Sequence, residues 1–401
     1  MQKIILFIVV LASFVSCNLD KLEPAQTKAF MKFFGDIGNT EGVDLLKLDD
    51  GYLLLGNNTN GGLETALLIK TDLNGNTIWS AYFENISASA LAKNDNSYFI
   101  VGDSINNNNL PDNNLPYTRM SLIKTDLDGR NHEYKSLGVT NVPYHGTGIT
   151  VSRSDQVVVC GYINGLLSGT DTTFLYDYDF SLTPAWSAVR KWQTDGDIRI
   201  SSKTLIQNDD DDFVYTTMYG SSNSIEAIIA AEDSPTPLAM DILKDFNSTN
   251  EPGDFYLNSF DNNGALVQTV INNGNKDIAF VTYDSLAVRT VLLSPNTAKN
   301  YYAGTVVHAT GSEYVVLGST DDHGQSSRSD LDFYITKVGV DGSVSSISGF
   351  TSIIGGTGDE TGAAIVQAED RGFVFIGTMH NTSDVKIMVL MKVDVNGNMI
   401  N

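Results

Sequence analysis

The feature of this sequence that most constrains its fold is an internal repeat. The centre of each repeat is a short apolar segment ending in Gly, and copies occur at residues 52–56, 98–102, 157–161, 314–318 and 373–377, with a weaker copy lacking the Gly at 213–217. A second apolar segment with an Asp-containing turn follows, at residues 67–75, 121–129, 334–342 and 389–397. Repetition on this scale predicts several equivalent small sheets rather than one irregular core.

The size of the repeat and its apolar pattern favour one architecture. Units begin near residues 42, 88, 146, 199, 257, 305 and 361, which gives seven units of about 46 to 58 residues, the size of four-stranded propeller blades. The central segments are continuous apolar runs, whereas a strand with one wet face alternates apolar and polar residues. The sequence therefore predicts an all-β fold, a seven-bladed β-propeller of four-stranded antiparallel blades.

The two ends of the repeat region predict how such a ring closes. The last unit stops at Asn401, before the fourth strand that the first unit reaches at Trp79. Residues 29–35 resemble a fourth strand, and the segment that follows, 38–42, matches 358–362 in the seventh unit. We expect the N-terminal strand to complete the last blade, which hides a sheet edge, and the propeller to cover residues 29–401.

The first 28 residues predict export and an anchor. Lys3 precedes an apolar run and then Ser16 and Cys17, the layout of a secretory signal peptide. A membrane-spanning helix needs about 20 apolar residues, and polar residues follow too soon for one. Residues 14–17 resemble the lipobox of bacterial lipoproteins, in which the Cys carries the lipid. We expect a signal peptide at residues 1–16, lipidation of Cys17 and a tether at 17–28; secretion without a lipid is the alternative.

The repeat as a whole resembles those of lipoproteins and secreted proteins of Bacteroidetes-type bacteria. The resemblance lies in residues 51–56, in residues 67–76 and in Trp79, and it extends over residues 29–401. It implies a β-propeller at the bacterial cell envelope, lipid-anchored in the outer membrane. It implies no reaction.

Charge and cysteine content restrict the partners and the chemistry. The chain has 25 Lys and Arg against 48 Asp and Glu, a net charge of −23, with a pI near 4.4. Nucleic acid is excluded as a partner because binding a phosphate backbone needs a basic face. Cys160, the one cysteine besides Cys17, lies in an apolar segment and is interpreted as inert packing.

No motif in the sequence predicts a cofactor, a metal or a catalytic centre. The segments 72–76 and 126–129 resemble calcium loops but lack the Glu and the helices of an EF-hand, so we interpret them as hairpin turns in which side-chain oxygens accept local N–H groups. The acidic run 209–212 is interpreted as a solvated hairpin tip. The turn before Trp79 also resembles the Asp-box and the tryptophan-docking repeat, and we interpret it as a shared packing solution.

In propellers, ligands meet the mouth of the central channel, which the loops entering each innermost strand and the loops linking the two middle strands surround. The candidate binding residues on these loops are Glu41, Asp44, His145, Arg199, Asp359 and Glu360. The loops 106–117 and 321–330 would add contacts at the rim. The competing interpretation of each residue is ordinary loop polarity.

Three hypotheses for function follow. The first is a non-enzymatic envelope lipoprotein whose propeller binds a protein or glycan partner. The second is a polysaccharide-acting hydrolase or lyase with acidic residues at the channel mouth. The third is an assembly scaffold for an outer-membrane machine. Paired carboxylates meet in space rather than in sequence, so the sequence leaves the second hypothesis open.

Overall fold

A computed structural model gives the arrangement of residues 29–399, except for 36–37, 107–116, 139–141, 164–171, 185–189, 194–204, 208–210, 219–224, 231–237, 244–255, 261–262, 284–287, 312, 325–327, 340–348 and 381–384. Several predictions concern residues outside this described part. They are the signal peptide, Cys17, the tether, Arg199 and most of the loop 106–117.

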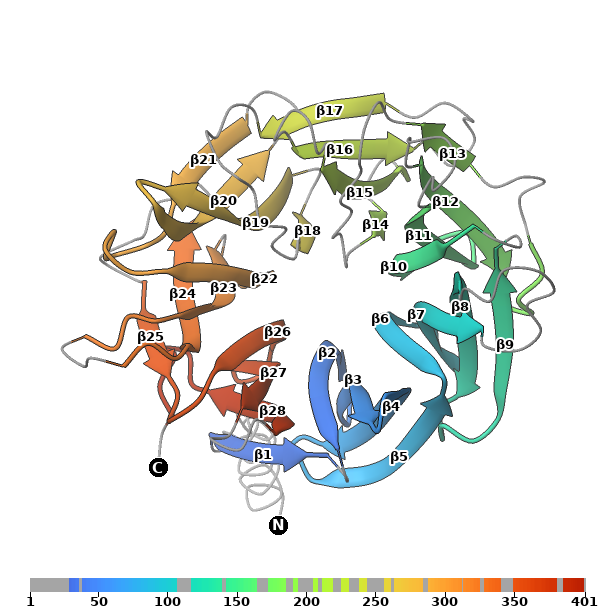
Figure 1. Cartoon of the computed structure of the whole chain (residues 1–401), viewed down its shortest axis with the longest axis horizontal. Coiled ribbons are helices and arrows are strands. Elements are labelled where there is room, and N and C mark those ends of the chain that lie inside the picture. Colours follow the sequence, from blue (N-terminus) through green and yellow to red (C-terminus); the bar gives the residue numbers. More distant parts are fainter. Residues whose placement is uncertain are drawn as a thin grey trace, which may run out of the picture.

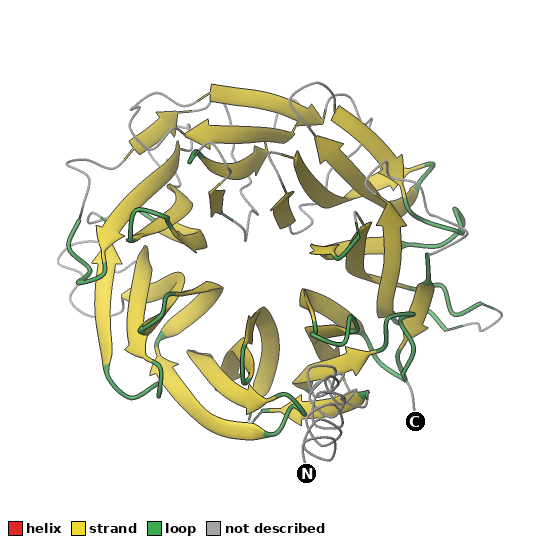
Figure 2. Cartoon of the chain, turned by 180° about the vertical axis from the view of Figure 1, so that it is seen from behind, coloured by secondary structure: helices red, strands yellow, loops and turns green. Residues whose placement is uncertain are grey.

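The described residues form four-stranded antiparallel sheets and contain no helix. The sheets stand around a central axis, each with one strand innermost (Figure 1), and they are numbered here 1 to 7 in the order in which those innermost strands occur. The innermost strand is called the first strand of its sheet. The view from behind shows the same radial arrangement, with the connections at the ends of the strands (Figure 2). The prediction of an all-β fold built from equivalent antiparallel sheets is confirmed.

The first three sheets contain consecutive strands. Sheet 1 comprises β2 (Asn39–Leu48), β3 (Gly51–Asn60), β4 (Leu63–Asp72) and β5 (Thr77–Glu84). Sheet 2 comprises β6 (Ile86–Lys93), β7 (Ser97–Asn106), β8 (Tyr117–Asp126) and β9 (His132–Leu137). Sheet 3 comprises β10 (Tyr144–Val151), β11 (Gln156–Ile163), β12 (Thr172–Asp179) and β13 (Arg190–Gln193).

The next three sheets repeat this order. Sheet 4 comprises β14 (Ile206–Gln207), β15 (Phe213–Met218), β16 (Ile225–Ala230) and β17 (Leu238–Leu243). Sheet 5 comprises β18 (Tyr256–Phe260), β19 (Asn263–Asn272), β20 (Asn275–Tyr283) and β21 (Val288–Leu292). Sheet 6 comprises β22 (Tyr301–Ala309), β23 (Glu313–Thr320), β24 (Asp332–Gly339) and β25 (Thr351–Ile354).

Sheet 7 is the one sheet with a strand from the other end of the described chain. It comprises β26 (Glu360–Gln367), β27 (Phe373–His380), β28 (Lys386–Val393) and, outside β28, β1 (Phe30–Phe34). The strand β1 pairs antiparallel with β28, Phe30 opposite Lys392 and Phe34 opposite Met388. The N-terminal strand thus occupies the place of a fourth strand.

The core lies between neighbouring sheets. The second strands are buried along the continuous apolar runs that the repeat predicted, as in β3, where residues 51–56 are all buried. One cluster joins Leu54 and Leu67 of sheet 1 to Ile376 and Leu390 of sheet 7. Both faces of each such strand leave water, which explains why the apolar residues do not alternate.

A repeated polar link joins the innermost strand of one sheet to the second strand of the preceding sheet. The residue after the strand Gly accepts a hydrogen bond from the backbone N–H at the start of a bulge in the next sheet. Such links are Ala88 N to Asn57 Oδ1, Gly146 N to Asp103 Oδ1 and Gly42 N to Thr378 Oγ1, at 2.8, 2.9 and 3.0 Å. A bulge frees an N–H from the sheet ladder, and the link satisfies it.

A repeated aromatic contact joins the outer parts of neighbouring sheets. A Cβ on Gly129, Gly75 or Gly397 would lie within 2.4 to 2.7 Å of the ring of Trp79, Phe30 or Phe350, respectively. All three glycines have positive φ and lie in the turn after a third strand. Only a glycine leaves room for both the turn and the ring. Phe30 of β1 therefore packs on the turn of sheet 1 in the same way as Trp79 of β5 packs on the turn of sheet 2.

Candidate functional site

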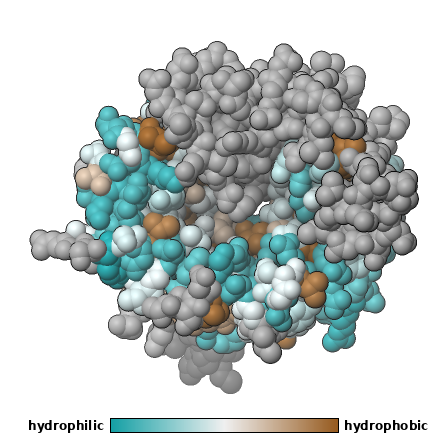
Figure 3. Space-filling view, viewed as in Figure 1, coloured by the Kyte–Doolittle hydropathy of each residue, from teal (hydrophilic) through white to brown (hydrophobic). Residues whose placement is uncertain are grey.

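The described candidate residues other than Asp44, which lies in the middle of β2, are at one end of the strands, called here the mouth end. In each sheet the first strand begins where the second strand ends, as the pairs Thr40–Asn58, His145–Tyr162 and Glu360–Met379 show. The links between neighbouring sheets lie near this end, so the sheets present it on the same side. The face shown in Figure 3 is mostly hydrophilic where it is described, with hydrophobic residues scattered over it.

Asp44 and Glu41 connect sheet 1 to its two neighbours. The Oδ2 atom of Asp44 accepts a hydrogen bond from the N–H of Leu91 in sheet 2, at 2.8 Å. The carboxylate of Glu41 pairs with Lys386 Nζ of sheet 7. Both side chains therefore have a structural partner across a sheet boundary.

His145 connects sheet 3 to sheet 2. Its Nδ1 atom lies 2.6 Å from Asp103 Oδ2, and its ring stacks on Tyr162 with the centroids 4.5 Å apart. The side chains of His145 and Asp103 are 18% and 24% exposed, which leaves this pair in contact with solvent at the mouth end.

Asp359 and Glu360 connect sheet 7 to sheet 6. Asp359 Oδ1 accepts the N–H of Leu331 at 2.9 Å, and the N–H of Glu360 donates to the carbonyl of Leu331 at 2.6 Å. The N–H of Gly358 donates to Asp330 Oδ2 at 2.9 Å. These bonds fasten the segment 355–360, which enters β26, to the segment 328–332, which enters β24.

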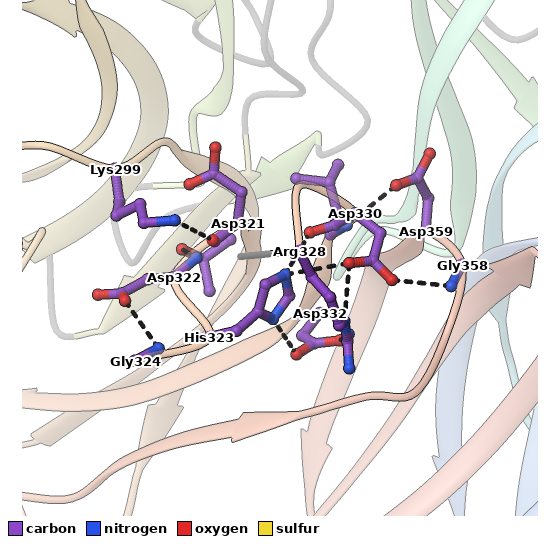
Figure 4. Close-up of polar contacts among 12 residues, drawn as sticks. Lys299, Asp321, Asp322, His323, Gly324, Arg328, Asp330, Asp332, Gly358 and Asp359 are labelled. Carbon is purple, nitrogen blue, oxygen red and sulfur yellow. Dashed lines mark hydrogen bonds and ion pairs between the residues drawn. The ribbon is translucent and has the colours of Figure 1, made fainter. Parts of the chain in front are cut away.

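The structure adds a charged cluster at this boundary that the sequence did not single out, here called the boundary cluster: His323, Arg328, Asp330, Asp332 and Glu360. Figure 4 shows the imidazole of His323 between the two aspartates. Its Nδ1 lies 2.6 Å from Asp332 Oδ2 and its Nε2 lies 2.7 Å from the carbonyl of Asp330. A ring protonated on both nitrogens donates to both acceptors.

Arg328 completes the pairing of these two aspartates. Its Nε donates to Asp330 Oδ1 at 2.9 Å and its Nη2 to Asp332 Oδ1 at 3.0 Å (Figure 4). Both basic side chains thus contact the two aspartates. The third carboxyl of the cluster is that of Glu360.

Glu360 is the anomalous member of the boundary cluster. Its side chain is fully buried, and neither carboxyl oxygen has a hydrogen-bond partner among the described residues. A Cβ on Gly355 would lie 2.0 Å from Asp332 Oδ1 and 2.6 Å from Glu360 Oε2, so the two carboxyls border the same glycine. Burial, followed by interaction with the Asp332 carboxyl, raises the pKa of Glu360 to about 8, and the side chain is therefore mostly protonated at neutral pH.

The repeat supplies an internal reference for this position. Glu360 lies two residues before the bulge of its first strand, and the residues at the same place in four other sheets are all buried and uncharged: Thr40, Ile86, Tyr144 and Tyr301. Asn58 Nδ2 donates to Thr40 Oγ1, and the Tyr301 hydroxyl donates to Asp322. A buried acid without a partner is thus a departure from the repeat and not a property of it.

The next position along these first strands forms a varied polar ring, here called the mouth ring. Its members in the same five sheets are exposed or half-buried: Glu41, Ser87, His145, Tyr302 and Thr361. Two of the predicted candidates, Glu41 and His145, belong to it. An acid, an imidazole, a phenol and two hydroxyls at one repeated position give the mouth end an uneven surface for recognition.

The calcium-like segments are turns. Asp72 Oδ1 accepts the N–H groups of Asn74 and Asn76, and Asp126, Asp179 and Asp394 make the same pair of bonds in their own sheets. Among the described residues no group of three or more His, Cys, Asp or Glu is arranged to hold a metal ion. Burial raises the pKa of the Cys160 thiol to about 12, as expected for packing.

The sequence predicted Asp359 and Glu360 as candidate binding residues but did not predict the residues that surround them. His323 comes from the loop 321–330, which was expected only to touch the rim, and Asp332 is the first residue of β24, which no prediction included. The density of His, Arg and Asp over residues 321–332 was the available signal. Arg199 lies outside the described residues.

Comparison with known proteins identifies the fold class. No protein-family model matches the sequence, and no curated protein matches it. Among solved structures, the polysaccharide lyase Uly1 is similar with a TM-score of 0.52 at 9% identity, over 93% of each chain. The β-propeller domain of the Trilobed protease from Pyrococcus furiosus is similar with a TM-score of 0.51 at 9% identity, over 90% of this chain and 97% of that one.

An acylaminoacyl peptidase is also similar, with a TM-score of 0.53 at 9% identity over 89% of this chain. The chain spans about half of that peptidase, 52% of its length. At such low identity these likenesses show a fold and nothing about activity. The protein has a β-propeller fold.

Proposed function

We propose that this protein is a non-enzymatic binding module, displayed at the bacterial cell envelope by a lipid on Cys17, whose mouth end takes a protein or glycan partner. The observation that carries the proposal is the mouth ring. One repeated position presents chemically different polar groups, while the acids beside it are used to fasten neighbouring sheets together. Rigid scaffolds with varied exposed positions are typical of recognition surfaces.

The proposal includes a closed ring of seven blades formed by residues 29–401. Its support is the pairing of β1 with β28, the bond from Gly42 N to Thr378 Oγ1 and the apolar cluster shared by sheets 1 and 7. Closure makes the mouth a fixed surface, because each sheet is held on both sides.

The direction of β1 gives the anchored propeller an orientation. Phe30 pairs with Lys392, at the end of sheet 7 opposite to Glu360, which pairs with Met379. Ala29 therefore precedes β1 on the side away from the mouth end. A lipid on Cys17 would hold that side towards the membrane and turn the mouth towards partners. Among the described residues no helix is long and apolar enough to cross the bilayer.

A second candidate function is a polysaccharide-acting lyase or hydrolase. Glu360 favours it, because a carboxyl that stays protonated near neutral pH is what a general acid requires. The similar fold of a polysaccharide lyase is compatible with this. Full burial of Glu360 counts against it, since a catalytic acid must reach its substrate.

The deciding experiment captures partners from intact envelopes with the full-length protein. Thr361→Arg places a large cation in the mouth ring, and Asn74→Arg places the same side chain on an exposed turn at the opposite end. We expect capture of a specific protein or glycan that Thr361→Arg abolishes and Asn74→Arg preserves. Equal capture by both variants would reject the mouth as the binding surface. Product release from a polysaccharide panel that Glu360→Gln abolishes would establish the second function instead.

The anchor has its own test. Replacing Cys17 with Ser should move the protein from the membrane fraction to the soluble fraction, whereas replacing Cys160 with Ser should leave its fractionation unchanged. A Cys17→Ser variant that stays with the membrane would contradict lipidation.

A further inference from the structure

The Glu360 carboxyl is placed where its charge state controls a contact between two segments. It lies at the first residue of β26, and the bonds from the segment 355–360 to the segment 328–332 are made within two residues of it. In the corresponding position of sheet 1, Thr40 is buried with a hydrogen bond and carries no charge.

We propose that Glu360 and Asp332 form a proton-operated latch between the segments 328–332 and 355–360 at the mouth end. With a proton on Glu360, the two carboxyls that border Gly355 are an acid and a carboxylate, and the buried one of the pair carries no charge. Without that proton, two carboxylates border Gly355 and one of them is buried and unpaired. The latch concerns how the mouth is held together, so it does not depend on which partner binds there or on whether any does.

The charges around Glu360 give the latch its direction. From the loop before β24 come His323, Arg328 and Asp330, and β24 itself contributes Asp332. Arg328 and His323 contact these two aspartates. At the mouth ends of the other strands packed against β26, Glu41 of β2 pairs with Lys386 of β28, the Tyr301 hydroxyl of β22 donates to Asp322, and His380 of β27 adds an imidazole. The carboxylates of Asp332 and Asp330 oppose ionisation of Glu360.

The response of the segment 355–360 follows from its composition and its bonds. Ionised Glu360 regains hydration only by moving out of its buried site, and that movement breaks the bond from its N–H to Leu331 O. The bonds from Leu331 N to Asp359 and from Gly358 N to Asp330 connect the same two segments, so the same movement weakens them. Gly355, Gly356 and Gly358 give this segment the backbone freedom to move. The pKa of Glu360, raised to about 8, puts the transition within one unit of neutral pH.

Two measurements on the full-length protein test the latch. The first is the titration of the Glu360 side-chain carboxyl by ¹³C NMR between pH 5 and 10, assigned with Glu360→Gln. The second is hydrogen exchange of the backbone amides of Leu331, Gly358 and Glu360, corrected for the intrinsic pH dependence of exchange. We expect Glu360 to titrate between pH 7 and 9. We expect protection of the three amides to fall at least tenfold between pH 7 and 9.

The matched variants separate a latch from general alkaline loosening. Glu360→Gln keeps the shape and stays uncharged, so protection should stay constant over the same range. Glu133→Gln, at an exposed acid of β9, should behave like the unmodified protein. Titration of Glu360 near pH 4.5, or a loss of amide protection that persists in Glu360→Gln, would overturn the proposal. If Glu360→Gln does not fold, Glu360→Thr, which introduces the residue of the same position in sheet 1, replaces it in both the assignment and the exchange measurement.

Discussion

The boundary between sheets 1 and 2 and the boundary between sheets 6 and 7 are made of the same repeated parts, and only the second of them has a fully buried carboxyl group. Each has an aromatic ring on a turn glycine, Trp79 on Gly129 and Phe350 on Gly397. Each has a polar link to the bulge of the next first strand, from Asn57 at one and from Ser319 at the other. The second boundary adds the boundary cluster with its buried acid.

This difference separates what the repeat needs from what the protein adds. Ile86 fills the buried position of sheet 2 at no electrostatic cost, whereas Glu360 fills it in sheet 7 with an ionisable group. A buried acid without a partner lowers stability wherever it must stay protonated against its solution pKa. Residues that break a local rule without a compensating contact are expected at functional sites, which is why the boundary of sheets 6 and 7 is the more informative one.

The largest expected effect tests whether the boundary between sheets 7 and 1 contributes to stability like the boundaries between sheets of consecutive strands. Deleting residues 29–35 removes β1, exposes the edge of β28 and takes Phe30 off Gly75. We expect a loss of roughly 5 kcal/mol in the free energy of unfolding, from lost pairing and burial. Denaturant unfolding measures it, and deletion of residues 18–24 in the expected tether is the control. Equal midpoints for both deletions would show that β1 is not part of the closure.

The second-largest effect is the pH dependence of stability that Glu360 adds at the boundary of sheets 6 and 7. The pKa of Glu360 is about 8 in the folded protein against 4.5 for the free side chain, so between these values the folded state binds one more proton than the unfolded state. Stability must then fall as pH rises, by about 1.4 kcal/mol per pH unit from this group. We expect the difference in unfolding free energy between Glu360→Gln and the unmodified protein to grow by about 4 kcal/mol from pH 5 to pH 8. A difference that does not change with pH would place the Glu360 pKa near its ordinary value.

The third effect compares the aromatic contacts at two boundaries. Trp79→Ala removes the ring on Gly129 within consecutive strands, and Phe30→Ala removes the ring on Gly75 where β1 joins sheet 7. Both rings are partly buried, so each substitution should cost about 2 kcal/mol. Thermal unfolding checks this, with Tyr82→Ala on the exposed side of β5 as the control. A Phe30→Ala variant as stable as the control would show that the boundary between sheets 7 and 1 differs from the boundary between sheets 1 and 2.

Much of the fold could be predicted because several copies of one apolar pattern indicate the same kind of strand. The runs at residues 52–56 and 373–377 became β3 and β27, buried on both faces, and residues 29–35 became β1 beside β28. The segments after Lys70 and Lys124 became turns capped by Asp72 and Asp126. One copy alone would have been ambiguous between a strand and a buried helix segment.

The site was harder to predict for the opposite reason. The boundary cluster brings His323 and Asp332 next to Glu360, and these residues come from different sheets in a place where sheets 1, 2, 3 and 6 have a buried uncharged residue. A repeat pattern contains no information about such an exception. Burial is also invisible in sequence, and burial is what distinguishes Glu360 from Glu41, an exposed acid one residue further along the equivalent strand.

The smallest expected effect concerns a part that the boundaries share, the turn after each third strand. Asp72 Oδ1 accepts two backbone N–H groups and its Oδ2 accepts Asn76 Nδ2. Burial raises the pKa of Asp72, but these hydrogen bonds outweigh it and lower the pKa below the ordinary value. The turn therefore contributes stability above the unfolded-state pKa that is lost as pH falls through the folded one.

Replacing Asp72 with Ala should cost about 1 kcal/mol at neutral pH, since it leaves N–H groups without their acceptor. The cost should shrink at pH 3, where protonation of Asp72 already weakens the bonds. Asp95→Ala, an exposed Asp in another turn, is the control, and chemical unfolding at the two pH values is the measurement. The turn at Asp72 lies beside Phe30, and the turn at Asp126 lies beside Trp79. If Asp72→Ala costs much more than Asp126→Ala, the boundary between sheets 7 and 1 depends more on its turn than the boundary between sheets 1 and 2 does. Equal costs would place the two boundaries in one class and leave Glu360 as the feature that distinguishes the boundary of sheets 6 and 7.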